Sequence, residues 1–204
     1  MEKEWFTSWF DTPYYHTLYK SRNDDEAKKF VIHLINYLKL PKTAKVLDLA
    51  CGKGRHSVTL NKLGYDVLGV DLSPMSIASA NQYRNDRLRF AVHDMREVIK
   101  NESFNLILNL FTSFGYFDSN KENEKVLHSI HSMLKNNGII VIDFMNAIRV
   151  TENLVESEVK TVDGLVFNIH RKYDGSYIYK NIKFKENGKL FTFTEKVQAL
   201  KKKD

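Results

Sequence analysis

The chain has 204 residues, of which 43% are apolar and 27% are charged, with 9 Gly and 3 Pro. This composition suits one globular domain and excludes collagen-like, low-complexity and wholly disordered chains. The single cysteine, Cys51, excludes internal disulfides and cysteine-cluster metal sites, so we expect no metal and a reducing, cytoplasmic location.

The formal net charge is +6, and the C-terminal residues 196–204 contribute +3 of it through four lysines and one aspartate. A terminal lysine run is more often a solvated end than a phosphate-binding patch. No stretch approaches the roughly 18 to 20 apolar residues of a membrane helix. The sequence therefore disfavours a nucleic-acid partner and predicts no membrane partner.

Residues 1–45 form the first predicted segment. Residues 5–19 are rich in Trp, Phe and Tyr, which favours packing against a core over a cover for a ligand. Residues 24–40 have apolar side chains at spacings of three and four, with acidic residues at the start and Pro41 just past the end. This pattern predicts an amphipathic helix.

Residues 46–150 alternate short apolar runs with helical patterns. The predicted strands are residues 46–49, 67–70, 88–92, 106–110 and 139–144, and the predicted helices are residues 54–63, 74–83 and 122–134. Strands joined by helical crossovers imply a parallel sheet that is covered on both faces, the doubly wound α/β class. Ligands of such sheets bind beyond the carboxyl ends of the strands.

Residues 151–204 alternate apolar and polar side chains in the ranges 165–173, 177–185 and 190–199. The dipeptides Asp174-Gly175 and Asn187-Gly188 separate these runs and are strong hairpin signals. We therefore predict an antiparallel β-meander that is appended to the α/β core within the same domain, where it covers a sheet edge or walls a substrate pocket.

The first predicted strand leads into a glycine turn with a nearby carboxylate. Gly52 and Gly54 allow the backbone to approach a ligand closely, and Asp48 lies just before them. The dinucleotide fingerprint requires a third glycine where this chain has Ser57. Hydride transfer is therefore the less favoured interpretation.

Carboxylates also follow the second and third predicted strands. Asp71 is placed to bind both hydroxyls of a ribose, although Ser73 and Pro74 also make this segment a plausible helix start. Asp94 and Met95 suit an adenine, with the carboxylate accepting from the exocyclic amine and the thioether packing on the ring. A capping role for Asp94 is an equal alternative.

Five segments in order resemble the successive motifs of class I S-adenosylmethionine-dependent methyltransferases, especially those that act on small molecules. These segments are Asp48-Leu-Ala-Cys-Gly-Lys-Gly54, Gly69-Val-Asp71-Leu-Ser73, His93-Asp94-Met95, Phe104-Asn-Leu-Ile-Leu-Asn109 and Leu134-Lys-Asn-Asn-Gly138-Ile-Ile-Val-Ile-Asp143. The resemblance spans about residues 40 to 146. It implies a Rossmann-like fold and S-adenosylmethionine as the cofactor.

The resemblance also implies site residues. The methionine part of the cofactor would be held by Asp48, by the backbone at Ala50 and Gly52, and by the turn at Gly54. Asp71 would bind the ribose, and Asp94, Met95 and Leu72 would contact the adenine. Asn109 and Leu110 would lie beside the sulfonium. In the N-terminal segment, read as a lid, Tyr14 would lie near the sulfonium and Arg22 would bind the methionine carboxylate.

The methyl acceptor would meet the segment after the fourth strand. Ser113, Phe114 and Tyr116 are candidates for its wall, although these aromatic residues can also simply pack the loop. In-line methyl transfer depends chiefly on how the protein positions the cofactor and the acceptor, and it does not require a dedicated base. The sequence offers His56, His93, Tyr116 and Asp143 as bases and selects none of them, so the catalytic residue stays unknown.

The expected function is methyl transfer to a nitrogen or oxygen of a small molecule. An RNA methyltransferase is an alternative, but the segment Asn109-Leu-Phe-Thr lacks the Asn/Asp-Pro-Pro-Tyr/Phe run that is frequent in amino-group methylation of bases. A non-catalytic module that binds the cofactor is another. The family's last two core strands, expected after the meander, are missing before residue 204, so we expect a longer natural product or self-association through an open sheet edge.

Overall fold

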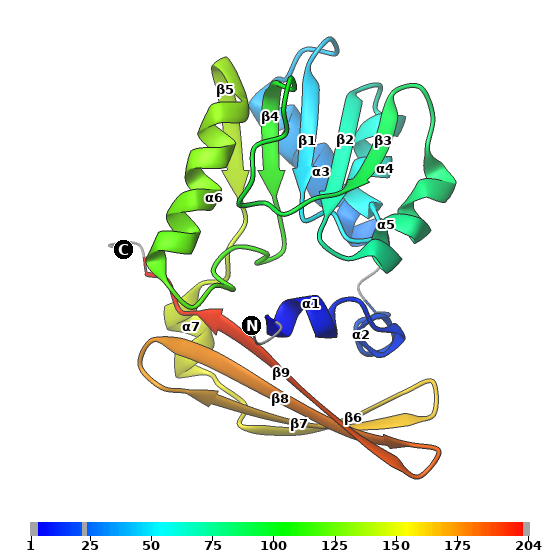
Figure 1. The fold of residues 1–204 in the computed structure, drawn as a ribbon, viewed down its shortest axis with the longest axis vertical. Coiled ribbons are helices and arrows are strands. Elements are labelled where there is room, and N and C mark those ends of the chain that lie inside the picture. The colour runs from blue at the N-terminus through cyan, green and yellow to red at the C-terminus, as the bar shows by residue number, and fades with distance from the viewer. Residues whose placement is uncertain (1–3, 22–23, 202–204) are drawn as a thin grey trace. The chain divides into compact units, whose positions relative to one another are not determined.

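The computed structural model describes residues 4–21 and 24–201, and its internal contacts divide the chain into two compact units (Figure 1). One unit, here called the α/β unit, comprises residues 22–114 and 118–144. The other, the meander unit, comprises residues 1–21, 115–117 and 145–204. The long N-terminal helix thus groups with the parallel sheet, whereas the aromatic segment before it groups with the meander.

The described residues of the α/β unit form a five-stranded parallel sheet in the order β3-β2-β1-β4-β5. Its strands are β1 (Lys45–Leu49), β2 (Asp66–Asp71), β3 (Leu88–Val92), β4 (Phe104–Asn109) and β5 (Leu134–Ile142). Its helices are α3 (Asp24–Leu38), α4 (Arg55–Lys62), α5 (Pro74–Ala80), the short 3-10 turn η1 (Asn81–Tyr83) and α6 (Asn120–Met133). This confirms the doubly wound, Rossmann-like fold class.

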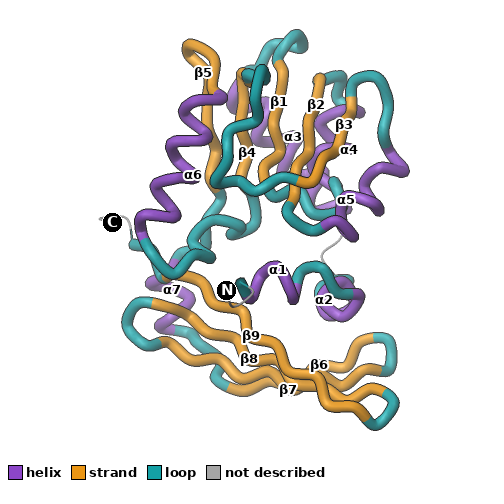
Figure 2. The backbone as a smooth tube through the Cα atoms, viewed as in Figure 1, coloured by secondary structure: helices purple, strands orange, loops and turns teal. Residues whose placement is uncertain are grey.

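Helices cover both faces of this sheet. In Figure 1, α3 and α4 lie on one face and α6 lies on the other. The residue segment between β3 and β4 contains no helix and runs as a loop, drawn in teal in Figure 2. The apolar core joins β1, β2 and β4 to the inward stripe of α3, where Val31 is fully buried. The continuous apolar strands predicted in the sequence are therefore the buried centre of the sheet.

The last parallel strand begins earlier than the sequence predicts. β5 starts at Leu134 instead of residue 139, and its register with β4 shifts between Phe104 and Leu106. The polar residues 135–137 interrupt the apolar pattern there and are exposed. Such an irregularity is tolerated because β5 is an edge strand of the sheet.

The described part of the meander unit contains a four-stranded antiparallel sheet in the order β6-β7-β8-β9. Its strands are β6 (Ser157–Val162), β7 (Leu165–Tyr173), β8 (Tyr177–Glu186) and β9 (Lys189–Gln198), and its helices are α1 (Trp5–Trp9), α2 (Pro13–Leu18) and α7 (Ala147–Glu152). The predicted meander is confirmed, and β6 and α7 are additional elements that the sequence analysis does not predict.

The aromatic N-terminal segment packs on the antiparallel sheet. Helices α1 and α2 lie along one face of that sheet (Figure 2). The indole N–H of Trp9 and the hydroxyl of Tyr19 both donate to the carboxylate of Glu195 on β9, each at 2.7 Å. Trp9 is fully buried and its ring contacts Phe193 at a centroid distance of 4.5 Å. The aromatic residues therefore form the apolar core of this unit.

Candidate functional site

The candidate site lies at the carboxyl edge of the parallel sheet, where the predicted residues of four strands converge. The register pairs Leu49 with Val70, Asp71 with Val92, and Asn109 with Ile142. Because all these strands run in the same direction, the residues at their carboxyl ends meet at one edge of the sheet. Asp48, Ala50, Gly52, Asp71, Asp94 and Asn109 are therefore brought together within the α/β unit.

The turn after β1 has an unusual backbone conformation. Ala50, Gly52 and Gly54 have φ angles of 64°, 56° and 80°, in the left-handed region that favours glycine. A Cβ atom added at Gly52 would meet nothing within 4 Å, whereas one added at Gly54 would lie 2.6 Å from the ring of Phe90. Gly52 thus leaves open space at the site, and Gly54 makes room for a core side chain.

Asp71, at the end of β2, is fixed by backbone donors. Its Oδ2 atom accepts from the N–H of Gly52 at 2.8 Å and its Oδ1 atom accepts from the N–H of Ser73 at 2.9 Å. Ser73 caps α5 by accepting from the N–H of Ser76, and Pro74 is the first helical residue. The predicted helix start is confirmed. Because the cap uses Ser73 and leaves the Asp71 carboxylate at the turn, the ribose-binding role of Asp71 is compatible with it and stays a prediction.

Asp48 is buried inside β1, with 1% of its surface exposed. Its Oδ2 atom accepts a hydrogen bond of 2.5 Å from the hydroxyl of Ser57 on α4. Burial raises the pKa of Asp48 to about 6, although the Ser57 hydrogen bonds oppose this shift. In the structure, this carboxyl group joins β1 to the first turn of α4 beneath the glycine turn.

Asn109, the last residue of β4, is fully buried and only half satisfied. Its Nδ2 atom donates to the carbonyl of Leu49 at 3.1 Å and lies 3.9 Å from the sulfur of Met95. Its Oδ1 atom is buried and has no hydrogen-bond partner within the described parts of the chain. Unpaired buried acceptors are rare in proteins, so this oxygen fits a site that receives a donor from a ligand.

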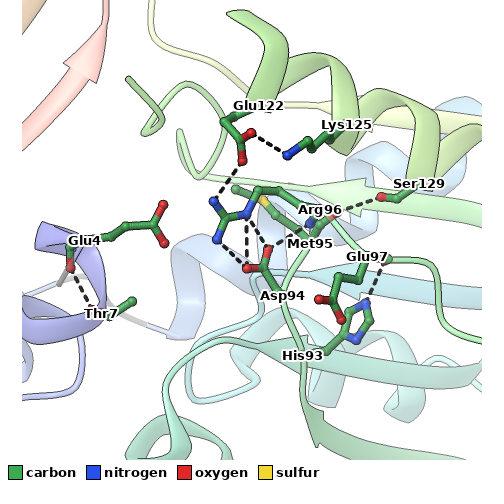
Figure 3. Close-up of polar contacts among 10 residues, drawn as sticks. All are labelled: Glu4, Thr7, His93, Asp94, Met95, Arg96, Glu97, Glu122, Lys125 and Ser129. Carbon is green, nitrogen blue, oxygen red and sulfur yellow. Dashed lines mark hydrogen bonds and ion pairs between the residues drawn. The ribbon is translucent and has the colours of Figure 1, made fainter. Parts of the chain in front are cut away.

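Asp94, after β3, is paired with Arg96, as Figure 3 shows. The guanidinium donates from Nη2 to Oδ2 at 2.6 Å and from Nε to Oδ1 at 3.0 Å. Burial acts to raise the pKa of Asp94, but the hydrogen bonds and charge of Arg96 outweigh it and lower the pKa. The sequence analysis does not include Arg96 among the site residues. The feature that could have indicated it is an arginine two residues after a carboxylate in a predicted loop.

The loop after β4 contains two consecutive residues in the left-handed region. Phe111 and Thr112 have φ angles of 59° and 58°, which are costly for residues with a Cβ atom. Asp143 stabilises this conformation, because its Oδ2 atom accepts from the N–H of Phe111 at 3.0 Å and its carbonyl accepts from the N–H of Thr112 at 2.9 Å. Asp143, one of the possible bases, thus has a structural role in the loop.

His56, another possible base, lies at the start of α4 and is 5% exposed. Its ring stacks on Phe111 at a centroid distance of 5.0 Å, and its Nε2 atom is buried without a partner among the described residues. Burial, and then the charge of Arg55, lower the pKa of His56 to about 3. The imidazole is therefore neutral near pH 7.

The remaining predicted site residues divide between the two units. In the α/β unit, Leu72 is half-buried, Leu110 is buried, and Ser113 donates its hydroxyl to the carbonyl of Leu110 at 2.9 Å; Phe114 is also buried. In the meander unit, Tyr14 and Tyr116 pack among aromatic rings. Arg22 lies outside the described residues, so the lid and acceptor-wall assignments stay predictions.

Tyr14 has a complete set of contacts inside the meander unit. Its hydroxyl donates to the carboxylate of Glu186 at 2.5 Å, and its ring contacts Phe184 and Phe191 at 4.7 and 4.9 Å. The hydrogen bond to Glu186 raises the pKa of Tyr14. These contacts explain a tyrosine at this position by packing alone.

The α/β unit fits a ligand with hydroxyl, amino and ammonium groups. Asp71 and Asp94 present carboxylates at neighbouring strand ends, Gly52 leaves open space beside the turn after β1, and Asn109 offers a buried acceptor. Within residues 4–21 and 24–201, no group of three or more His, Cys, Asp and Glu side chains is arranged to hold a metal ion, and no helix is long and apolar enough to cross a membrane.

Comparison with known proteins identifies the matching family. Residues 46–138 match the model of a family described as a methyltransferase domain. A glycine/sarcosine N-methyltransferase from Aphanothece halophytica is 34% identical over 131 residues, which are 62% of this chain and 48% of that protein. The chain spans about half the length of the curated relatives that it matches first.

Two solved structures have the same fold. An S-adenosylmethionine-dependent methyltransferase from Clostridium acetobutylicum superimposes with a TM-score of 0.76 at 21% identity, over 93% of this chain and 80% of that one. CalS10 from Micromonospora echinaspora, an amino pentose methyltransferase solved with the cofactor bound, gives a TM-score of 0.72 at 18% identity, over 94% and 84% of the two chains.

Proposed function

We propose that the chain is a class I S-adenosylmethionine-dependent methyltransferase and that it transfers the cofactor's methyl group to a nitrogen or oxygen atom of a small molecule. The match of residues 46–138 to a methyltransferase domain supports this proposal. The observation that carries this proposal is the convergence of Asp71, Asp94, Gly52 and the unpartnered Asn109 oxygen at one sheet edge. These groups complement a ribose, an adenine and a charged methionine end.

The cofactor, when bound, supplies a methyl group on a sulfonium together with its own leaving group. The protein's contribution is then to bind and orient. Asp71, already fixed by two backbone donors, accepts from the ribose hydroxyls, and Asp94 accepts from the exocyclic amine. The Asn109 oxygen supplies a fixed partial negative charge, which favours a cation at the end of β4.

An amine is the first acceptor to test. The relative from Aphanothece halophytica, 34% identical over its matched region, is a glycine/sarcosine N-methyltransferase. A neutral amine nitrogen attacks a sulfonium methyl group directly and needs no strong base, which agrees with an α/β unit in which His56 and Asp143 already have structural contacts.

The test is an acceptor screen with cofactor labelled in its methyl group. The panel contains glycine, sarcosine, an amino sugar, a catechol as an oxygen acceptor, and a tRNA fraction. Label transfer to a small molecule that is lost in Asp71→Ala supports the proposal. Transfer to the tRNA fraction alone contradicts the small-molecule acceptor, and tight cofactor binding without transfer to any acceptor in a full metabolite extract contradicts catalysis.

A further inference from the structure

The loop after β3 contains a charged network, of which the proposed function uses Asp94 alone. Arg96 lies between two carboxylates, Asp94 in the same loop and Glu122 on α6, and all three side chains are largely buried (Figure 3). Its Nη1 atom donates to Glu122 at 3.0 Å, and Lys125 donates to the other oxygen of Glu122 at 2.6 Å. Arg96 therefore connects Asp94 to α6 through Glu122.

Each oxygen of the Asp94 carboxylate accepts two hydrogen bonds from Arg96, but only three donor protons make these four contacts. Within the described part of the chain, three N–H groups reach it, all from Arg96: the backbone N–H at 2.9 Å, the Nε–H, which is shared between the two oxygens at 3.0 and 3.1 Å, and an Nη2–H at 2.6 Å. An ionised carboxylate accepts about four hydrogen bonds. A fourth donor can therefore bind to Oδ2 when the shared Nε–H settles on Oδ1 alone, and Arg96 is not displaced.

The same loop is fastened to α6 at a second point. The hydroxyl of Ser129 on α6 donates to the carbonyl of Met95 at 2.6 Å. The sulfur of Met95 lies 3.9 Å from Asn109. Because Arg96 and Met95 are both tied to α6, the Asp94 carboxylate has a fixed position relative to the end of β4.

We infer that Arg96 is a positioning residue of the nucleobase subsite, which holds the Asp94 carboxylate in one orientation so that its Oδ2 atom receives the exocyclic amino group of the cofactor. This inference rests on the proposed function, in which Asp94 faces the adenine. The planar fork of a guanidinium fixes both carboxylate oxygens at once, which a lysine ammonium cannot do. Arg96 also keeps Asp94 ionised, since its charge and hydrogen bonds lower the pKa of that carboxyl group.

The experiment compares two ligands that differ at the exocyclic amino group and at the adjacent ring nitrogen N1, which carries a proton when the amine is replaced by a carbonyl. Calorimetry measures the affinity of the full chain for S-adenosylhomocysteine and for S-inosylhomocysteine, in which a carbonyl oxygen replaces the exocyclic amine. The variants are Arg96→Ala, Arg96→Lys and Glu122→Gln, with Arg84→Ala as a control at an exposed arginine of the same unit. Thermal unfolding verifies that each variant is folded.

We expect the wild-type chain to prefer the adenosyl ligand, and Arg96→Ala to lose about tenfold in affinity for it while the inosyl ligand is nearly unaffected, so that the preference collapses. Arg96→Lys should lose most of the preference, Glu122→Gln a smaller part, and Arg84→Ala none. An equal loss for both ligands, or an unchanged preference, overturns the inference while leaving the proposed function intact. Failure of the wild-type chain to bind S-adenosylhomocysteine refutes the proposed function itself.

Discussion

The backbone N–H of Gly52 donates a hydrogen bond of 2.8 Å to the carboxylate of Asp71, which joins the turn after β1 to the end of β2. The N–H of Ser73 donates to the other oxygen at 2.9 Å, so both oxygens are fixed by the backbone. A carboxylate that is oriented before a ligand arrives loses less freedom on binding. This relationship makes Asp71 the side chain on which cofactor affinity should depend most.

Replacing Asp71 should weaken binding of the cofactor. We expect Asp71→Ala to cost about 1 to 3 kcal/mol of binding free energy, because charge-assisted hydrogen bonds to the ribose are lost. Asp66→Ala, at the opposite end of the same strand, is the matched control and should bind normally. Calorimetry with S-adenosylhomocysteine measures both variants, and equal affinity in Asp71→Ala would remove Asp71 from the site.

The burial of Asp48 should make folding stability depend on pH. The pKa of this carboxyl group is about 6 in the folded protein and 3.8 in an exposed chain, so the folded state binds the proton more tightly. Its contribution to stability is therefore greatest below pH 3.8 and decreases as the pH rises to about 6, by about 3 kcal/mol in total. Above pH 6 the loss is complete.

Asp48→Asn tests this dependence, because asparagine has the same shape and cannot ionise. The difference in unfolding free energy between Asp48→Asn and the wild-type chain should shift in favour of the variant between pH 4 and pH 7. Urea denaturation at several pH values measures it. The change of this difference with pH tests the prediction, whereas a constant difference in unfolding free energy reflects the new amide near Ser57. A difference that does not change with pH would contradict the raised pKa of Asp48.

His56 should produce the opposite dependence. Its folded-state pKa is lowered from 6.5 to about 3, so its contribution to stability is present above pH 6.5 and is lost as the pH falls toward 3. His56→Phe retains a flat ring against Phe111 and cannot be protonated. We expect this variant to gain about 2 kcal/mol relative to the wild-type chain between pH 8 and pH 5.

The same urea measurements at pH 5 and pH 8 decide this point. Because Asp48 and His56 have opposite slopes between pH 4 and pH 6, the wild-type profile should be flatter there than the profile of either variant. Parallel profiles for His56→Phe and the wild-type chain would show that His56 is protonated at its ordinary pKa.

Asp143 should act through the conformation of its loop and not as a base. Asp143→Asn retains an oxygen that can accept from the N–H of Phe111, whereas Asp143→Ala leaves that N–H without its acceptor. We expect Asp143→Ala to lose about 1 to 3 kcal/mol of stability and Asp143→Asn clearly less. With an acceptor from the screen, Asp143→Asn should retain most of the methyl-transfer rate, and a rate that collapses in Asp143→Asn at unchanged stability would assign it the role of a base.

The central strands were predictable because their environment is uniform. β1, β2, β3 and β4 begin and end within two residues of the predicted boundaries. β1, β2 and β4 are apolar runs in the buried core, whereas β3 is an edge strand whose last two residues are exposed. β6 escaped prediction because its inward-facing positions include Glu158 and Lys160. Glu158 pairs with Arg171 at 2.5 Å and Lys160 donates to the carbonyl of Leu18 at 3.1 Å. Such partners come from distant parts of the sequence, and periodicity does not reveal them.

The candidate site shows the same limit. The strand-end carboxylates Asp71 and Asp94 were predictable from their positions after apolar runs. The contact of Phe90 with Gly54 was not, because it depends on which side chain of a neighbouring strand fills the space above the glycine. The unpartnered oxygen of Asn109 likewise becomes visible only when all neighbours of the side chain are known.

The central claim is that the carboxyl edge of the parallel sheet binds S-adenosylmethionine. Calorimetric titration of the chain with S-adenosylhomocysteine, alongside a parallel titration with a nicotinamide dinucleotide, tests it most directly. We predict saturable one-to-one binding of S-adenosylhomocysteine that is weakened in Asp71→Ala, and no comparable binding of the dinucleotide. Tighter binding of the dinucleotide, or no detectable binding of S-adenosylhomocysteine to the folded chain, would contradict the account.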